Sequence, residues 1–227
     1  MIQNITGKDI LNAQPIFLDL DGTIARSGEG CKNSIRFMCG KIGMELTEEE
    51  INHFVGPAII IHLQQAHGFS EGDATRAYKF YREYYDSKGI YENWPYSGIE
   101  ALLQRLCEMG RTLYVATLKP QEQAEQILAR FGFTEYFTAI FGASYEKGRT
   151  NKERVMEYAD RTIGGIPQSA AIVGDRYHDV LAGKHMGIGT VGVTYGYGSP
   201  GELTEAGCDV LVDTVEEIAE VFGGKAV

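Results

Sequence analysis

The amino-acid sequence predicts an α/β fold: a doubly wound, Rossmann-like parallel sheet with an all-α segment inserted after its first strand. Six short apolar runs recur along the chain, and they are continuous rather than alternating, as in strands buried on both faces. Helical patterns separate the later runs, and one long stretch contains no strand-like run. The predicted strands are 15–18, 112–116, 138–141, 170–173, 190–193 and 209–212.

The inserted stretch follows the first strand and has helical signals throughout. Residues 31–44 have a helical pattern, and Thr47 followed by three glutamates is typical of a capping box. Residues 57–66 are apolar and compatible with a helix, and Ser70 is placed to open a longer one. We therefore predict an all-α domain over 24–95.

The remaining elements belong to the sheet domain. Apolar residues three and four apart predict helices near 99–106 and 124–131, and a shorter one near 155–159. These helices alternate with the second, third and fourth predicted strands, which is the order of a doubly wound domain. The predicted domains are thus an α/β core of 1–23 and 96–227 and the helical insert of 24–95.

Composition and charge exclude several classes of protein. The chain has 227 residues, of which 44 % are hydrophobic, so a disordered protein is not expected. No apolar run approaches the length of a membrane span. The formal net charge is −10, and the lysines and arginines do not cluster, so we expect no nucleic-acid or membrane partner.

The start of the sequence and its cysteines indicate the compartment. The first residues lack the basic and apolar regions of a secretory signal. The spacing of the four cysteines suggests neither a metal site nor a disulfide framework. We expect reduced thiols and a cytoplasmic protein, acting as a monomer or a homodimer. The four are Cys31, Cys39, Cys107 and Cys208.

Two carboxylates follow the first predicted strand, in the run Asp19-Leu20-Asp21-Gly22-Thr23. Ligands of doubly wound sheets bind at the carboxyl ends of the strands, so this position favours a functional site. Residues two apart at a strand end are expected to point the same way, and two like charges there require a cation or a raised pKa. The alternative is an ordinary Asp-Gly turn.

Weaker signals follow the next strands. The second predicted strand ends at Thr117, whose hydroxyl either donates to an anion or caps a helix that starts near Pro120. Lys152 opens the helix before the fourth strand, where its charge opposes the helix dipole. An anionic ligand would explain this lysine; simple solvent exposure is the alternative, and Lys147 is a possible rival.

A second acidic pair follows the fourth predicted strand, in Gly174-Asp175-Arg-Tyr-His-Asp179. Asp175 and Asp179 are four apart, so they share one face if a helix begins there. Oxygen-rich sites with few protein ligands suit Mg²⁺, whereas an acidic helix start is the alternative. The five histidines match no zinc spacing, and we interpret them as surface or insert residues.

Taken in order, these motifs resemble the haloacid dehalogenase superfamily of phosphohydrolases. The resemblance covers nearly the whole chain, and the helical insert after the first motif resembles that family's cap domain. The phosphoglycolate-phosphatase-like branch is the most similar, on the text around Phe54–Pro57 and Val193–Gly198. The first and last motifs are specific when they occur together.

The resemblance implies a role for each motif. Asp19 would be the nucleophile that forms an aspartyl-phosphate, and Asp21 the general acid and base. Thr117 and Lys152 would hold the phosphoryl oxygens. The implied cofactor is Mg²⁺, with Asp19, the backbone carbonyl of Asp21, Asp175 and Asp179 as its ligands.

The implied function is a Mg²⁺-dependent phosphatase of a small phosphorylated metabolite, similar to phosphoglycolate, a nucleotide or a sugar phosphate. A phosphomutase of the β-phosphoglucomutase type and a catalytically silent binding module remain alternatives. Arg26 stands where relatives often have an acidic residue, and Leu118 replaces a small polar one. The loop at Gly56 lacks a basic residue of some relatives. These departures concern specificity, for which Arg26 and Gly56 are the candidates.

Overall fold

The computed structural model describes residues 1–7, 10–55, 59–144 and 146–223, and it divides into two compact units. The first unit consists of residues 1–26 and 95–227, and the second of residues 27–94. Two short strands, β3 (Ala25–Arg26) and β4 (Trp94–Pro95), pair with each other where the chain passes between the units. The prediction of no strand in 24–95 is wrong at these four residues, because two-residue strands produce no periodic pattern.

The first unit is built on a seven-stranded sheet in the order β1-β9-β8-β7-β2-β5-β6. All neighbours are parallel except β1, which pairs antiparallel with β9 at the edge. The predicted α/β class is therefore confirmed. The strands are β1 (Gln3–Asn4), β2 (Ile16–Leu18), β5 (Leu113–Pro120), β6 (Ala139–Ala143), β7 (Ala171–Gly174), β8 (Gly189–Val193) and β9 (Val210–Val212).

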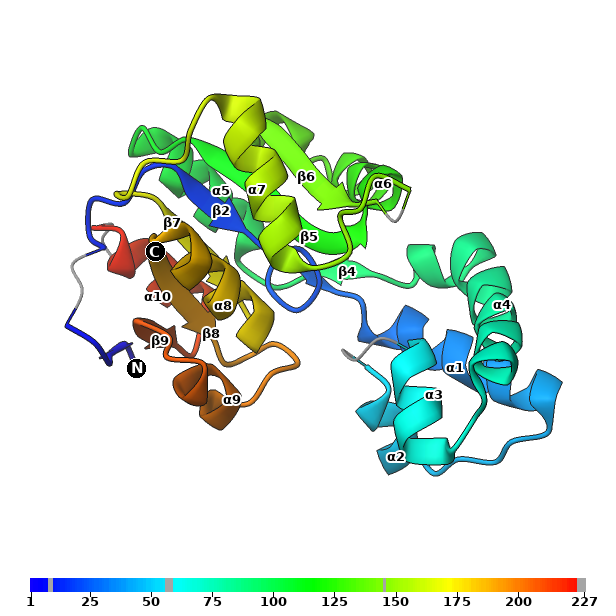
Figure 1. Cartoon of the computed structure of the whole chain (residues 1–227). Coiled ribbons are helices and arrows are strands. Elements are labelled where there is room, and N and C mark those ends of the chain that lie inside the picture. Colours follow the sequence, from blue (N-terminus) through cyan, green and yellow to red (C-terminus); the bar gives the residue numbers. More distant parts are fainter. Residues whose placement is uncertain (8–9, 56–58, 145, 224–227) are drawn as a thin grey trace. The chain divides into compact units, whose positions relative to one another are not determined.

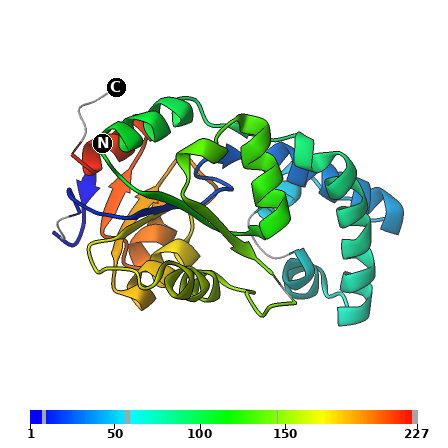
Figure 2. The ribbon, with the colours of Figure 1, turned by 90° about the horizontal axis from the view of Figure 1, so that it is seen from above.

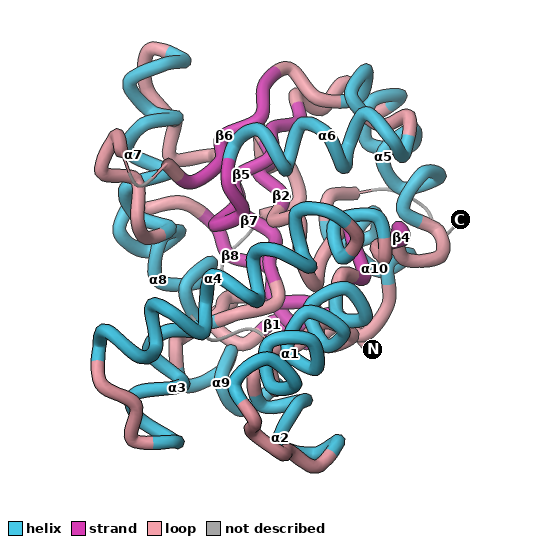
Figure 3. Tube along the Cα trace, turned by 90° about the vertical axis from the view of Figure 1, so that its right-hand side faces the viewer, coloured by secondary structure: helices cyan, strands magenta, loops and turns pink. Residues whose placement is uncertain are grey.

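Helices cover both faces of this sheet, with α7 and α8 on one side and α5, α6 and α10 on the other (Figures 2 and 3). Every residue of β2 and β7 is buried, as continuous apolar runs predict. Phe17 and Ile172 face a core shared with Val155 and Met156 of α7. The helices are α5 (Ile99–Glu108), α6 (Gln121–Phe131), α7 (Lys152–Ile163), α8 (Tyr177–Met186), α9 (Pro200–Glu205) and α10 (Val215–Val221), with a 3₁₀ turn at Thr134–Tyr136.

Two predicted boundaries in this unit are wrong. Helix α7, expected to be the shortest, has 12 residues, one more than α6. Strand β5 continues through Pro120 and does not end at Thr117, because Pro120 lies opposite Ala143 of β6 after an irregularity in the pairing. The apolar run stops at Ala116, so the sequence pattern does not show this extension.

The second unit has its own apolar core. Helices α1 and α4 pack against each other and bury Ile35, Met38, Ala77 and Tyr81. Thr47 forms the predicted capping box with Glu50. The elements are α1 (Gly28–Ile42), α2 (Glu48–His53), α3 (Ile59–His67), α4 (Glu71–Ser87) and a 3₁₀ turn at Gly89–Tyr91.

Within the part of the chain that is described, no helix combines the length and the apolar character that crossing a membrane requires.

Candidate active site

The candidate site lies at the carboxyl ends of three adjacent strands, β7, β2 and β5. Asp19 follows β2 directly, and its backbone N–H continues the parallel pairing by donating to the carbonyl of Val173 (2.9 Å). Asp175 follows β7, and Thr117 lies in β5. Because the three strands are neighbours in the sheet, residues 58 to 156 positions apart in sequence meet at one edge.

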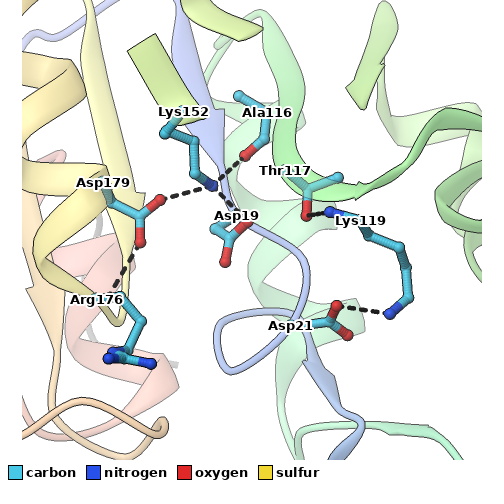
Figure 4. Close-up of polar contacts among 8 residues, drawn as sticks. All are labelled: Asp19, Asp21, Ala116, Thr117, Lys119, Lys152, Arg176 and Asp179. Atoms are coloured by element: carbon cyan, nitrogen blue, oxygen red, sulfur yellow. Dashed lines mark hydrogen bonds and ion pairs between the residues drawn. The ribbon is translucent and has the colours of Figure 1, made fainter. Parts of the chain in front are cut away.

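Lys152 lies at the centre of this edge (Figure 4). Its ammonium contacts Asp19 Oδ1 at 2.6 Å and Asp179 Oδ1 at 2.7 Å, and it donates to the carbonyl of Ala116 at 2.8 Å. Its side chain is only 2 % exposed, although it is the first residue of α7. Solvent exposure, the alternative for this lysine, is therefore excluded, and Lys147 is exposed on the loop after β6.

Burial and charge act against each other at this ion pair. Burial raises the pKa of Asp19 to about 6, opposed by Lys152 and reinforced by Asp179. Burial alone would lower the pKa of Lys152, but the carboxylates of Asp179 and Asp19 outweigh it and raise that pKa above its ordinary value. Lys152 is therefore held as a cation.

The carboxylates of Asp19, Asp175 and Asp179 are buried, with one oxygen of each within 4.8 Å of the others. Burial, followed by the charges of Asp19 and Asp179, raises the pKa of Asp175 well above its ordinary value. Asp175 Oδ2 accepts from the backbone N–H of Tyr197 (2.6 Å), whereas its Oδ1 is buried without a hydrogen-bond partner among the described residues. A divalent cation among these oxygens would satisfy that atom, so the residues fit a magnesium site.

Glycines bring the backbone close to these carboxylates. A Cβ on Gly174 would lie 2.1 Å from Cγ of Asp179, and a Cβ on Gly22 would lie 2.1 Å from Oδ2 of Asp175. Gly22 also has a φ of +88°, which other residues rarely adopt. Asp179 is held further by the backbone N–H of Arg176, which donates to its Oδ2 at 3.2 Å. Close packing thus fixes both acidic side chains.

The side chains of Asp21 and Asp19 point in different directions. Asp21 Oδ2 contacts the ammonium of Lys119 at 2.6 Å, so the two aspartates face different lysines (Figure 4). The expectation that they point the same way is wrong, because the chain turns directly after β2 and no longer follows strand geometry. The carboxylate of Asp21 is outside the acidic triad; the predicted use of its backbone carbonyl stays a prediction.

Lys119 is a member of this edge that sequence reasoning missed. It lies two residues after Thr117 in β5, and its backbone N–H donates to Thr117 Oγ1 at 3.2 Å. The period-two spacing from Thr117 was the available signal, but the Lys-Pro dipeptide is typical of the start of a loop.

His178, which we interpreted from the sequence as a surface or insert residue, is half-buried in α8. Burial, together with the charges of Lys152 and Arg176, lowers the pKa of His178 to about 4.

Of the two residues predicted to determine specificity, Arg26 and Gly56, only Arg26 is among the described residues. Arg26 lies exposed on β3 of the first unit. Its charge acts on Tyr96, whose pKa is raised to about 12 chiefly by burial and by Asp175, with Arg26 opposing. Arg26 and Asp175 therefore both act on Tyr96, with opposite signs. Gly56 lies outside the described residues.

The comparisons with known proteins agree on one family. The model of the family described as haloacid dehalogenase-like hydrolase matches residues 16–193. A 5′-nucleotidase of Pseudomonas aeruginosa is 37 % identical over 189 residues, covering 83 % of this chain and 86 % of that protein. A phosphoglycolate phosphatase of Agrobacterium fabrum is 28 % identical over 216 residues, covering 92 % of each protein.

Two further similarities extend this result. A protein of Mycobacterium tuberculosis named tyrosine-protein kinase PtkA is 35 % identical over 213 residues, covering 92 % of this chain and 72 % of that one. The crystal structure of a predicted phosphatase from Clostridium acetobutylicum superposes with a TM-score of 0.85 at 37 % identity, covering 92 % of this chain and 97 % of that one.

Proposed function

Because the chain belongs to the haloacid dehalogenase-like hydrolases and is a phosphatase of that family, we propose that it is a magnesium-dependent phosphomonoesterase of a small metabolite. One observation carries the proposal: Asp19 directly follows the interior strand β2, is hydrogen-bonded to buried Lys152 and belongs to an acidic triad. A carboxylate in that setting suits attack on a phosphoryl group whose charge the cations neutralise.

Asp19 and Asp21 divide the covalent chemistry. A carboxylate oxygen of Asp19 attacks phosphorus, forming an aspartyl-phosphate as the bond to the leaving oxygen breaks. Asp21 gives its proton to that oxygen. Water then attacks the aspartyl-phosphate, Asp21 takes up the water's proton, and phosphate leaves with the Asp19 carboxylate regenerated.

The remaining residues neutralise and orient the phosphoryl oxygens. Lys152 supplies a fixed positive charge beside Asp19, and Thr117 supplies a buried hydroxyl on the neighbouring strand. Asp19, Asp175 and Asp179 would hold Mg²⁺, with the backbone carbonyl of Asp21. Bound there, the ion would screen the carboxylates from the substrate phosphate.

The names of the relatives narrow the proposed substrate to two classes of phosphomonoester. Relatives named 5′-nucleotidase and phosphoglycolate phosphatase support a nucleoside monophosphate or a small phosphorylated acid as the substrate. We expect Arg26 to contact a polar group of the leaving alcohol, and the helical insert of 24–95 to act as a cap that selects it. No nucleic-acid or membrane partner is proposed.

Two other functions make different demands on the same site. A phosphomutase would return the phosphoryl group to a sugar and would need a bisphosphate primer, so release of phosphate without a primer distinguishes the two. A silent binding module would release none. Because one relative is named a tyrosine-protein kinase, phosphoryl transfer from ATP to a tyrosine peptide should be assayed as a control reaction.

The decisive experiment is a panel of nucleoside monophosphates, sugar phosphates and phosphoglycolate, assayed with Mg²⁺ for release of inorganic phosphate. Asp19→Asn removes the attacking carboxylate and should abolish turnover while the far-ultraviolet circular dichroism stays unchanged. Asp213→Asn, at an exposed aspartate of the same unit, is the matched control and should keep full activity. Residual turnover above a few per cent in Asp19→Asn, free of deamidation, would refute the assignment.

A further inference from the structure

Lys119 is one of two buried lysines that contact aspartates among the described residues of the site, and neither the motifs nor the proposed mechanism gives it a task. Its ammonium is 2.6 Å from Asp21 Oδ2, and the lysine side chain is only 6 % exposed, against 29 % for Asp21. A charge-assisted hydrogen bond of this length, largely shielded from water, restricts the orientation of the carboxylate strongly.

The backbone around Lys119 is itself held rigidly. Gly142 of β6 packs so closely that a Cβ there would lie 2.5 Å from Cα of Gln121 and 2.9 Å from the carbonyl oxygen of Lys119. The side chain of Gln121 bonds the carbonyl of Ile140 (2.8 Å) and the N–H of Gly142 (2.6 Å). The extension of β5 beyond Ala116 is thus fastened to β6, and Lys119 projects from a fixed support.

Lys119 also organises the phosphate-binding hydroxyl. Its backbone N–H donates to Thr117 Oγ1, so the oxygen of that hydroxyl is occupied as an acceptor and its proton remains available for an anion. The same residue therefore touches both Thr117 and Asp21.

The two oxygens of Asp21 are in different situations. Oδ2 is bonded to Lys119, whereas Oδ1 is buried and has no hydrogen-bond partner among the described residues. A buried carboxylate oxygen without a partner is costly unless a ligand supplies one. Lys119 therefore holds Oδ2 of Asp21 in place, and Oδ1 is available to give or accept a proton.

We propose that Lys119 is the positioning residue for Asp21: it holds one carboxylate oxygen so that the other faces the leaving oxygen of the substrate. The inference rests on the proposed phosphatase function. It assigns Lys119 to the departure of the alcohol, in contrast to Lys152, which is assigned to the phosphoryl group. Loss of Lys119 should therefore matter only where the leaving group needs a proton.

The test is the dependence of kcat/KM on the leaving group, measured with p-nitrophenyl, phenyl and alkyl phosphates. Lys119→Met keeps the length of the side chain and removes the charge. We expect a loss of about 100-fold with the alkyl phosphate, the lower end of what general acids contribute, and no loss with p-nitrophenyl phosphate. Lys119→Arg should restore part of the alkyl-phosphate activity, and Lys147→Met, at an exposed lysine, is the matched control.

Other results would overturn the inference. A loss equal for all leaving groups, with weaker inhibition by inorganic phosphate, would mean that Lys119 binds the phosphoryl group. No loss with any ester would mean that it does not position Asp21. In an Asp21→Asn background, Lys119→Met should cost nothing more, and a further loss would contradict action through Asp21.

Two results would prevent this test, and each requires an additional experiment. If Lys119→Met does not fold, Lys119→Gln replaces it in the same series. If the wild-type protein hydrolyses none of the esters, the proposed function fails, and a crystal structure of the Lys119 variant decides the positioning role alone. An Asp21 carboxylate that keeps its orientation there would refute the inference; a rotated one supports it.

Discussion

Replacing Lys152 by methionine removes a cation that two buried carboxylates share, while conserving most of the side chain's volume. Lys152 is 2 % exposed, and its partners Asp19 and Asp179 are 9 % and 3 % exposed. Removing one member of a buried ion pair costs about 3–5 kcal/mol, because it leaves an uncompensated charge. For a protein of this size that corresponds to a decrease of about 10 °C in the unfolding midpoint.

The pH dependence of this loss follows from Asp19. Its pKa is raised from 3.8 to about 6 in the folded state, so the folded protein binds more protons than the unfolded one between these values. The contribution of Asp19 to stability is therefore fully present below pH 3.8 and is lost as the pH rises through about 6. Without Lys152 this pKa rises further, so the variant should be close to the wild type at pH 4 and most destabilised at pH 8.

Differential scanning calorimetry of the metal-free protein measures this directly. Mg²⁺ should recover part of the lost midpoint at pH 8, because a cation that binds only the folded state stabilises it by mass action. Lys147→Met should stay within about 0.5 kcal/mol of the wild type, as exposed substitutions do. Midpoints for Lys152→Met and the wild type that agree within about 2 °C at pH 8 would refute the reasoning from buried charge.

Three further outcomes are expected. A chelator should silence phosphate release and Mg²⁺ restore it, while Ca²⁺, with its longer and looser coordination, should inhibit; full activity in the chelator would contradict the metal role. Gly174→Ala would force Asp179 to move, since the new Cβ would lie 2.1 Å from its Cγ; chemical denaturation should show a loss of about 1–3 kcal/mol, whereas Gly40→Ala, in open space within α1, should not destabilise. Arg26→Ala should raise KM for the physiological substrate more than for an aryl phosphate, and equal effects on both would return Arg26 to a structural role.

The sequence allowed much of the candidate site to be predicted, because strand ends carry its residues. Asp19 and Asp175 could be found because a continuous apolar run ends directly before Asp19 and one residue before Asp175, and adjacent parallel strands bring such ends together. Lys152 could be found because a lysine at a helix start is locally unfavourable. In each case the local pattern and the tertiary arrangement agree.

The rest depended on tertiary contacts that leave no local pattern. Strand β5 passes beyond its apolar run because Pro120 pairs with β6, so Lys119 was not recognised as a strand residue. Strand β1 consists of two exposed polar residues, Gln3 and Asn4, and exists only through its pairing with β9. Periodicity reports the burial of apolar side chains, and neither Lys119 nor the two residues of β1 is apolar.

The position of β2 in the sheet has a consequence for synthesis of the chain. It is made first among the parallel strands, yet its two neighbours are β5 and β7, the second of which begins at Ala171. In a nascent chain one edge of β2 therefore stays unpaired until β7 has left the ribosome. In that interval residues 27–94 form a unit with its own core. Since the entropic cost of closing a loop grows only logarithmically with its length, a longer insert would slow the meeting of β2 and β5 slightly and a shorter one would speed it slightly, without altering their register.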